Sequence, residues 1–438
     1  MTSFLAFIFV LGVLVFVHEL GHFLAARRIG VRVLTFSLGF GPKLFAFKRG
    51  DTEYCVSAIP LGGYVKMAGE NPDDARTGAP DEFLSKSKWE RFQVLIMGPV
   101  MNLALAVIVM ALVLYQGAEM PAFNEQPAYV GAVEEGSPAA AIGIQPGDLI
   151  VSVDGRQITD WGRLTMTVGT KANRPVPIVF LRDGKPIERE VTPEAVDKYE
   201  TGQIGVRPRL RPQIAEVTDG PAREVGLREG DVILAAAGER GVTFDRVLEI
   251  IRGHEGKTLT LEIERAGQPV SFAVTPREID GLVRIGARIR QAEALIIQPG
   301  IGEAFTLSVE RNWEWTVLIF ETLAGLFTQD TSVKQLMGPV GIAGLSGEAA
   351  EAGLIHLFSL MALISLNLGI MNLMPIPVLD GGHIAILGVE ALSRRDFSIR
   401  VKEKMLIAGF VLLVTLMVTV IYNDLTRVQW IERLMPWR

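Results

Sequence analysis

The stretch FLAFIFVLGVLVFVHELGHFLAA (residues 4–26) is apolar except for three ionisable side chains, His18, Glu19 and His22. It is long enough for one membrane-spanning helix. His18 and His22 lie one helical turn apart and face the same way, so two imidazoles can share one metal ion with Glu19 beside them as a general base. Because ionisable groups inside a span are functional candidates, we predict an intramembrane zinc site. The alternative is a pair of buried, hydrogen-bonded histidines.

The composition is that of a membrane protein with a soluble portion. Of the 438 residues, 49% are hydrophobic and 21% are charged, so much of the chain faces water. The formal net charge of −6 gives no indication of nucleic-acid binding, and the basic residues are distributed among loops instead of forming one patch, so we expect no nucleic-acid partner. The one cysteine, Cys55, excludes an internal disulfide, and we expect it to pack inertly.

The chain contains several apolar segments long enough to cross a bilayer. The first need not be a signal peptide, because it lacks a basic leader and a small-residue cleavage site. We predict a polytopic α-helical membrane protein with four transmembrane helices, at about residues 4–26, 92–116, 355–374 and 405–422.

Basic residues gather in the loops at one end of these spans, and such loops are cytoplasmic. Both termini and the long stretch 117–354 are therefore expected on the opposite side. The basic residues concerned are Arg27, Arg28, Arg32, Lys86, Lys88, Arg91, Arg394, Arg395, Arg400, Lys402 and Lys404.

Residues 305–327 are apolar in places but carry four charged residues beside Trp313 and Trp315. This pattern favours an amphipathic helix that lies along the membrane interface. If the segment crossed the membrane instead, the later spans would invert, and Asp380 would move to the face opposite the histidines.

The long stretch between the second and third spans contains an internal repeat. GIQPGDLI (residues 143–150) recurs as GLREGDVI (residues 226–233), and Asp148 precedes Asp231 by 83 residues, the length of a small domain. Alternating Val, Ile and Leu follow each copy. The repeat resembles the bacterial PDZ domain, which implies two α+β PDZ-like domains that capture peptides by strand addition or act as a steric filter.

A second polar constellation lies in NLGIMNLMPIPVLDGGH (residues 367–383), where Pro375 and Pro377 interrupt a helix at membrane depth. A non-helical backbone is tolerated at that depth only inside protein or beside water, so the stretch should line a cavity. Asp380 can then complete a zinc site of two histidines and one carboxylate, which leaves a fourth position for water. His383 is a weaker candidate for a supporting role.

Residues 31–70 predict hairpins with glycine turns on the cytoplasmic side. As a hypothesis, this membrane-associated β-hairpin region re-enters the membrane and offers a strand edge, at Tyr54–Ile59, to an unwound substrate. The alternative is a soluble cytosolic hairpin pair.

Taken together, HELGH in the first span, NLMPIPVLDGGH in the third and the PDZ-like pair between them resemble the site-2 protease family of intramembrane zinc metalloproteases. The resemblance implies that His18, His22 and Asp380 are the ligands of a Zn2+ cofactor and that Glu19 is the catalytic residue. It further implies that Asn372, together with Pro375 and Pro377, contacts substrate.

The same resemblance implies a protease of the bacterial inner membrane with its PDZ-like domains in the periplasm. Its substrates would be single-span membrane proteins, such as an anti-sigma factor after a prior cut, or remnant signal peptides. His22 lies five residues before Arg27, about 8 Å inside the cytoplasmic end of its helix, so cleavage should fall in that third of the substrate's span.

We expect five regions: 1–116 with the HExxH motif and the β region, 117–210 and 211–295 as PDZ-like domains, 296–352 with the interfacial helix, and 353–438 with the last two spans.

Two other function classes compete. A membrane-tethered PDZ scaffold or chaperone with a structural metal would not need Glu19, and a transporter would favour more polar residues across several spans.

Overall fold

The computed structural model describes residues 2–70, 78–196, 200–279, 281–297, 299–328 and 331–426. The chain divides into two compact units. Unit 1 comprises Met1–Ala118, Gln298–Gly325 and Leu336–Arg438, and unit 2 comprises Glu119–Ile297 and Leu326–Gln335.

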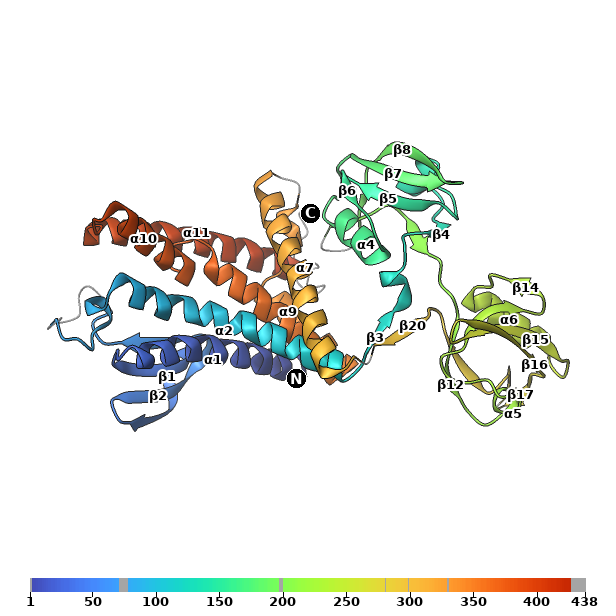
Figure 1. Cartoon of the computed structure of the whole chain (residues 1–438), viewed down its shortest axis with the longest axis horizontal. Coiled ribbons are helices and arrows are strands. Elements are labelled where there is room, and N and C mark those ends of the chain that lie inside the picture. The colour runs from blue at the N-terminus through green and yellow to red at the C-terminus, as the bar shows by residue number, and fades with distance from the viewer. Residues whose placement is uncertain are drawn as a thin grey trace. The chain divides into compact units, whose positions relative to one another are not determined.

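Unit 1 is a bundle of helices (Figure 1). Within the described residues, four of them, α1, α2, α9 and α11, are long and apolar enough to cross a membrane. The helices of unit 1 are α1 (Thr2–Arg28), α2 (Lys88–Tyr115), α7 (Ile301–Thr328), α8 (Pro339–Ala352), α9 (Leu354–Leu373), α10 (Asp380–Ser393) and α11 (Ile399–Thr426), with a 3-10 turn η1 (Phe83–Ser85) before α2.

Helices α1, α2 and α9 lie side by side and share one apolar core (Figure 1). Val10 and Leu14 of α1 pack there against Met110 of α2 and Met361 of α9. Further along α1, a side chain at Gly21 would lie 2.4 Å from the Met97 carbonyl oxygen, so glycine permits the close approach of α1 and α2. This close packing places the histidine motif of α1 against α2.

The cytoplasmic hairpins predicted for residues 31–70 form one antiparallel meander, made of β1 (Val33–Arg49) and β2 (Thr52–Met67). The first half of β1 pairs with both halves of β2: Phe36 faces Val65 and also Tyr54, and Tyr54 in turn faces Phe47. The prediction of a free edge at Tyr54–Ile59 is therefore wrong, because Tyr54–Val56 lie between two partner segments. The outer segments are 43–49 and 63–67.

Helix α7 is not among the candidate spans of the described residues. Its buried face carries Ala304, Ser308 and Asn312, and the Ser308 hydroxyl donates to the Val107 carbonyl of α2 at 2.7 Å. Its exposed surface has an apolar stripe that includes Trp313, next to acidic side chains. A helix with such a surface suits a membrane interface.

Unit 2 is built mainly of short strands. Its first half has a four-stranded sheet in the order β6-β5-β7-β8, and its second half has a sheet in the order β16-β15-β13-β12-β19 with β14 beside β13. The elements of the first half are η2 (Ala122–Glu125), β4 (Val130–Val133), α3 (Pro138–Ala141), β5 (Leu149–Val153), β6 (Arg156–Gln157), α4 (Trp161–Gly169), β7 (Val176–Arg182), β8 (Lys185–Val191), β9 (Glu194–Val196), β10 (Thr201–Gln203) and β11 (Val206–Pro208).

The second half repeats this arrangement. Strands β3 (Ala118–Pro121) and β20 (Ala294–Ile297), at the two ends of the repeats, pair with each other. The elements of the second half are β12 (Gln213–Val217), α5 (Pro221–Glu224), β13 (Val232–Ala236), β14 (Glu239–Arg240), α6 (Phe244–Gly253), β15 (Leu259–Arg265), β16 (Gln268–Val274), β17 (Arg277–Ile279), β18 (Leu282–Arg284) and β19 (Ala287–Arg290), and η3 (Val333–Gln335) belongs to the same unit.

Each half contains its own buried ion pair, at equivalent positions of the repeat. Asp148 is 2% exposed and accepts two hydrogen bonds from Arg182, at 2.9 and 2.8 Å. Asp231, 1% exposed, accepts two from Arg265, both at 2.7 Å. Each arginine also donates to the carbonyl oxygen of the glycine that opens the repeated motif. The same motif therefore folds in the same way twice, each time over its own apolar core.

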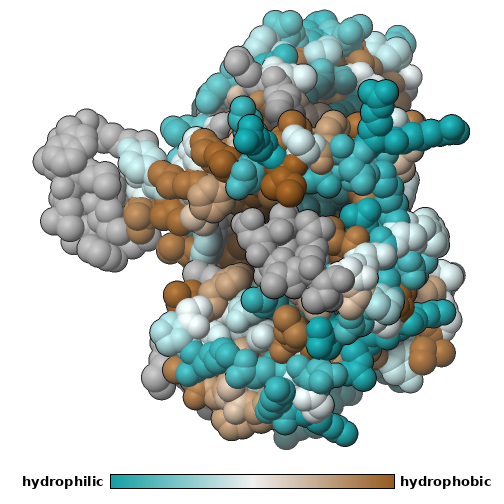
Figure 2. Space-filling model, turned by 90° about the vertical axis from the view of Figure 1, so that its left-hand side faces the viewer, coloured by the Kyte–Doolittle hydropathy of each residue, from teal (hydrophilic) through white to brown (hydrophobic). Residues whose placement is uncertain are grey.

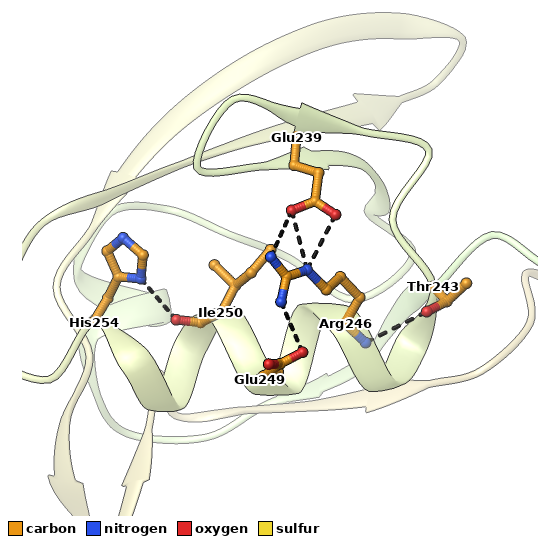
Figure 3. A network of polar contacts seen from close by, with 6 residues as sticks. All are labelled: Glu239, Thr243, Arg246, Glu249, Ile250 and His254. Carbon is orange, nitrogen blue, oxygen red and sulfur yellow. Dashed lines mark hydrogen bonds and ion pairs between the residues drawn. The ribbon is translucent and has the colours of Figure 1, made fainter.

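Helix α6 is fixed at both ends by local polar contacts (Figure 3). The Thr243 hydroxyl accepts from the Arg246 backbone N–H, and His254 Nδ1 donates to the Ile250 carbonyl at 2.8 Å. Arg246 itself bridges two glutamates on the surface, Glu239 and Glu249. These bonds account for the bounds of α6.

Candidate metal centre

Two helices bring three potential metal ligands together in unit 1. His18 and His22 come from α1, and Asp380 is the first residue of α10. Asp380 Oδ2 lies 3.2 Å from His18 Nε2 and 3.4 Å from His22 Nε2, and the two Nε2 atoms are 3.3 Å apart. The sequence separates Asp380 from the histidines by more than 350 residues, but the fold makes them one cluster.

The triangle of these atoms fits zinc. Zinc binds imidazole nitrogen and carboxylate oxygen at about 2.0–2.1 Å with tetrahedral geometry, which puts neighbouring ligand atoms about 3.3–3.4 Å apart. The observed separations of 3.2 to 3.4 Å match that spacing. Two imidazoles and one carboxylate leave one tetrahedral position for water or substrate, as in catalytic zinc sites.

The second ring nitrogen of each histidine also has a partner, and both partners belong to α2. His22 Nδ1 donates to the Val94 carbonyl oxygen at 2.8 Å, which leaves the lone pair of Nε2 directed at the cluster. His18 Nδ1 lies 3.2 Å from the Asn102 side-chain amide, and Asn102 is fully buried. Our sequence reasoning missed both partners. The only signal was a polar residue, Asn102, in the apolar second span.

Gly98 of α2 makes room for the imidazoles. A methyl group at this position would lie 2.3 Å from His22 Nε2 and 2.9 Å from His18 Cε1, far inside ordinary contact distance. The next residue, Pro99, has no N–H and so removes one backbone hydrogen bond from α2. The sequence reasoning missed Gly98 as well, because a glycine before a proline predicts only a weak point in a helix.

The loop between α9 and α10 is strained and tightly packed. Val378 has a φ of 96°, a backbone conformation that is costly for a β-branched residue. Side chains at Gly381 and Gly382 would lie 2.3 and 2.2 Å from backbone atoms of Leu373 and Ile376. The loop therefore folds closely over the first turn of α10 and holds Asp380 at its start.

The predicted substrate residues lie on the same loop or just before it. Asn372 lies in the last turn of α9, and Pro375 and Pro377 belong to the loop. The Pro377 carbonyl oxygen packs against Gly409 of α11, where a methyl group would lie 2.1 Å away.

Glu19 is buried beside the cluster, with 8% of its surface exposed, and interacts electrostatically with both histidines and Asp380. The outer strand segment 63–67 of the meander runs next to it, since a side chain at Gly63 would lie 3.0 Å from Glu19 Cγ. Within the described part of the chain this segment pairs on one side only, with β1, and so offers a strand edge beside the candidate base.

His383 lies one turn beyond Asp380 on α10, and it is not part of the metal-holding group of the described residues. Cys55 is a buried free cysteine of the meander, consistent with inert packing.

Helix α10 is anchored at its far end by buried charge. Glu390, 1% exposed, pairs with Lys402 of α11 at 2.7 Å, and its carbonyl oxygen accepts from Lys88 of α2 at 2.8 Å. Lys88 also pairs with Asp396, and this hydrogen bond lowers the pKa of the Asp396 carboxyl. Figure 2 views the molecule from the left-hand side of Figure 1, and both hydrophilic and hydrophobic side chains reach the surface that it shows.

Comparison with known proteins gives the family. The sequence model described as Peptidase family M50 matches residues 6–416. A protein of Neisseria meningitidis that carries the name of a zinc metalloprotease is 35% identical over 451 residues, covering 98% of this chain and 99% of that protein. Proteins named Regulator of sigma-E protease RseP from Salmonella typhimurium and Escherichia coli are each 34% identical, covering 96% of this chain and 98% of theirs.

Solved PDZ domains match only a part of the chain. The PDZ domain of an SdrC-like protein from Listeria monocytogenes is 26% identical and covers 19% of this chain and 87% of that domain, with a TM-score of 0.18. A second, from Listeria innocua, is 29% identical, also with a TM-score of 0.18.

Proposed function

The chain belongs to peptidase family M50 and is a zinc metalloprotease of the site-2 type, and we propose that His18, His22 and Asp380 hold its zinc ion. The observation that carries this proposal is the triangle of two imidazole nitrogens and one carboxylate oxygen, 3.2 to 3.4 Å apart, inside an apolar helix bundle. Glu19 stands beside it in the position of a general base.

The residues divide the work of peptide hydrolysis. The zinc ion supplies Lewis acidity, which lowers the pKa of water and stabilises negative charge on a carbonyl oxygen. Glu19 accepts a proton from the attacking water as its oxygen bonds to the scissile carbonyl carbon. Glu19 then gives this proton to the leaving nitrogen as the C–N bond breaks. Burial of Glu19 keeps bulk water from competing for that proton.

The substrates we propose are single-span membrane proteins, cut within or near the span. The relatives named regulators of sigma-E protease support an anti-sigma factor, cut after a prior cleavage, as the substrate class. Remnant signal peptides are a further class that such a site accepts. Asn372, Pro375 and Pro377 are proposed to contact the substrate, because Asn372 lies in the last turn of α9 and the two prolines lie in the loop that leads to Asp380.

A helical substrate must unwind before attack, since its own hydrogen bonds occupy its amides. We propose that the segment 63–67, which runs beside Glu19, pairs with the unwound stretch by strand addition. The exposed Phe45 and Phe47 of the opposite outer segment suit contact with lipid.

The proposed setting is the bacterial inner membrane. The ends of α1, α2, α10 and α11 that carry the basic residues are cytoplasmic in this proposal, which puts both termini and unit 2 in the periplasm. The two repeats of unit 2, within 117–210 and 211–295, are proposed as PDZ-like domains that bind peptide or exclude bulky substrates. The regions 296–352 and 353–438 are proposed as the interfacial region and the last two spans.

The experiment is cleavage of a purified single-span substrate by the full-length protein in detergent, with the cut located by mass spectrometry. Wild type is compared with Glu19→Gln, and bound zinc is measured in both. We expect Glu19→Gln to bind zinc like wild type and to lose cleavage by a factor of about 10²–10⁴. Cleavage by Glu19→Gln at the wild-type rate would overturn the proposed role of Glu19.

A further inference from the structure

Asn102 has an unusual environment for an amide. It lies in α2, its exposed fraction is 0%, and its side-chain nitrogen Nδ2 is 3.2 Å from His18 Nδ1. Its side-chain oxygen Oδ1 is buried and has no hydrogen-bond partner among the described residues. Leaving a buried acceptor unsatisfied costs about 1–3 kcal/mol, so a purely structural role for Asn102 is poorly served by this position.

The protonation pattern of His18 depends on which end of the amide faces it. If Nδ2 faces the ring, it donates to Nδ1, and the single proton of a neutral imidazole sits on Nε2, directed at Asp380 Oδ2 3.2 Å away. If the amide turns by a half rotation, Oδ1 faces the ring and accepts a proton on Nδ1. Nε2 is then bare and can bind a cation.

We propose that Asn102 is a positioning residue for the zinc site, which fixes His18 with Nδ1 protonated and Nε2 free to ligate. The inference rests on the proposed assignment of His18 as a zinc ligand. His22 obtains the same tautomer from the Val94 carbonyl oxygen, which is a fixed acceptor at 2.8 Å. His18 has a side-chain amide instead, which can donate to the ring or accept from it.

The backbone of α2 holds Asn102 in place. Ser365 of α9, also fully buried, donates from its hydroxyl to the Asn102 carbonyl oxygen at 2.7 Å. This bond ties α9 to α2 at the residue that faces His18, without engaging the side-chain amide. Ser365→Ala therefore removes a buried hydrogen bond of Asn102 but spares the proposed contact, and it is a matched control.

The experiment is a zinc titration of the full-length protein in detergent, by competition with a chelator of known affinity. Asn102→Leu removes the amide at similar volume, whereas Asn102→Asp keeps an acceptor. We expect zinc affinity to fall about 10- to 100-fold in Asn102→Leu, the usual loss when a ligand's supporting partner is removed. Asn102→Asp should keep the wild-type affinity or exceed it, and Ser365→Ala should keep it.

Thermal unfolding in excess chelator separates this effect from a general loss of structure. We expect the unfolding midpoint of each metal-free variant to equal that of metal-free wild type, even where zinc affinity falls. If Asn102→Leu does not fold, Asn102→Ala makes the same deletion. Zinc binding by the deletion variant as tight as wild type, or by Asn102→Asp as weak as the deletion, would overturn the inference.

His18→Ala is included to separate the two levels of the argument. If His18→Ala binds zinc like wild type, the ligand assignment fails. If His18→Ala loses zinc while the Asn102 deletion does not, only the role of Asn102 fails.

Discussion

Gly98→Ala is the sharpest structural perturbation of the proposed centre, because it adds one methyl group at a helix position that otherwise favours alanine. Alanine is better than glycine inside a helix by about 1 kcal/mol, so the substitution should not weaken α2 itself. The added methyl would, however, lie 2.3 Å from His22 Nε2, the atom proposed to bind zinc, and 2.7 Å from His22 Cε1.

The displacement follows from these distances. Non-bonded carbon atoms prefer separations of about 3.5–4.0 Å, so the His22 ring must move by about 1 Å or more to relieve the overlap. Zinc sites tolerate ligand distances only within about 0.2 Å of the ideal value. The ring cannot meet both conditions, since its Nδ1 is also bound to the Val94 carbonyl oxygen of the same helix at 2.8 Å.

We therefore expect purified Gly98→Ala to lose zinc binding and cleavage together while remaining folded. The assay is zinc content per chain by elemental analysis, with cleavage of a single-span substrate measured in the same preparation. Gly12→Ala in α1 is the control, because among the described residues no atom beyond the adjacent backbone of α1 lies within 4 Å of the added methyl. One bound zinc per chain and wild-type cleavage in Gly98→Ala would refute the packing argument.

Three further predictions concern stability. Arg182→Met leaves the buried Asp148 carboxylate without its ion-pair partner, which should lower the free energy of unfolding by about 3–5 kcal/mol. Asp148→Asn should lower it less, because the Arg182 side chain is 31% exposed and can reach water. Hydrogen exchange of the first repeat in the full chain measures both losses, and equal losses would contradict the reasoning. Burial acts to raise the pKa of Asp148, but its hydrogen bonds with Arg182 and the Gln145 N–H prevail, and the pKa in the folded protein is lowered. The resulting stabilisation is therefore present above the unfolded carboxyl pKa of about 3.9, and it is lost as the pH falls through the lower pKa of the folded state. The first repeat should thus lose exchange protection only in acid, and a loss between pH 5 and 7 would count against this account. Removal of zinc should lower the unfolding temperature of wild type, because free zinc at 100 times its Kd stabilises the folded state by about 2.7 kcal/mol. Removal of zinc should leave the unfolding temperature of Asp380→Ala unchanged.

The part of the site that could be predicted from sequence is the part whose chemistry is unusual for its surroundings. His18, Glu19 and His22 are polar in an apolar helix, and Asp380 follows two prolines at membrane depth. The structure brings His18, His22 and Asp380 together. Their roles as ligands remain predictions until zinc binding is measured.

The supporting residues could not be predicted in the same way. The Val94 contact uses a backbone carbonyl, which every residue has, and Gly98 matters only because α1 crosses α2 there. The pattern at Tyr54–Ile59 predicts a strand but carries no information on how many neighbours it has, and the structure places the outer edge at a later segment of the same strand, residues 63–67.

The two repeats carry a further sequence signal beyond the glycine-aspartate motif. The glycine-aspartate motif identified Asp148 and Asp231, but their partners Arg182 and Arg265 lie 34 residues further on, outside the motif. The same spacing of 83 residues separates these two arginines, so the comparison extended along the repeats would have found them.

The central claim, that one zinc ion is held by His18, His22 and Asp380, is tested most directly by zinc K-edge X-ray absorption of the purified full-length protein. The account predicts one zinc per chain with two imidazole nitrogens and a carboxylate oxygen at about 2.0–2.2 Å, and loss of one imidazole contribution in His18→Ala. A sulfur ligand at about 2.3 Å, which would point to Cys55, or an unchanged spectrum in His18→Ala would contradict it.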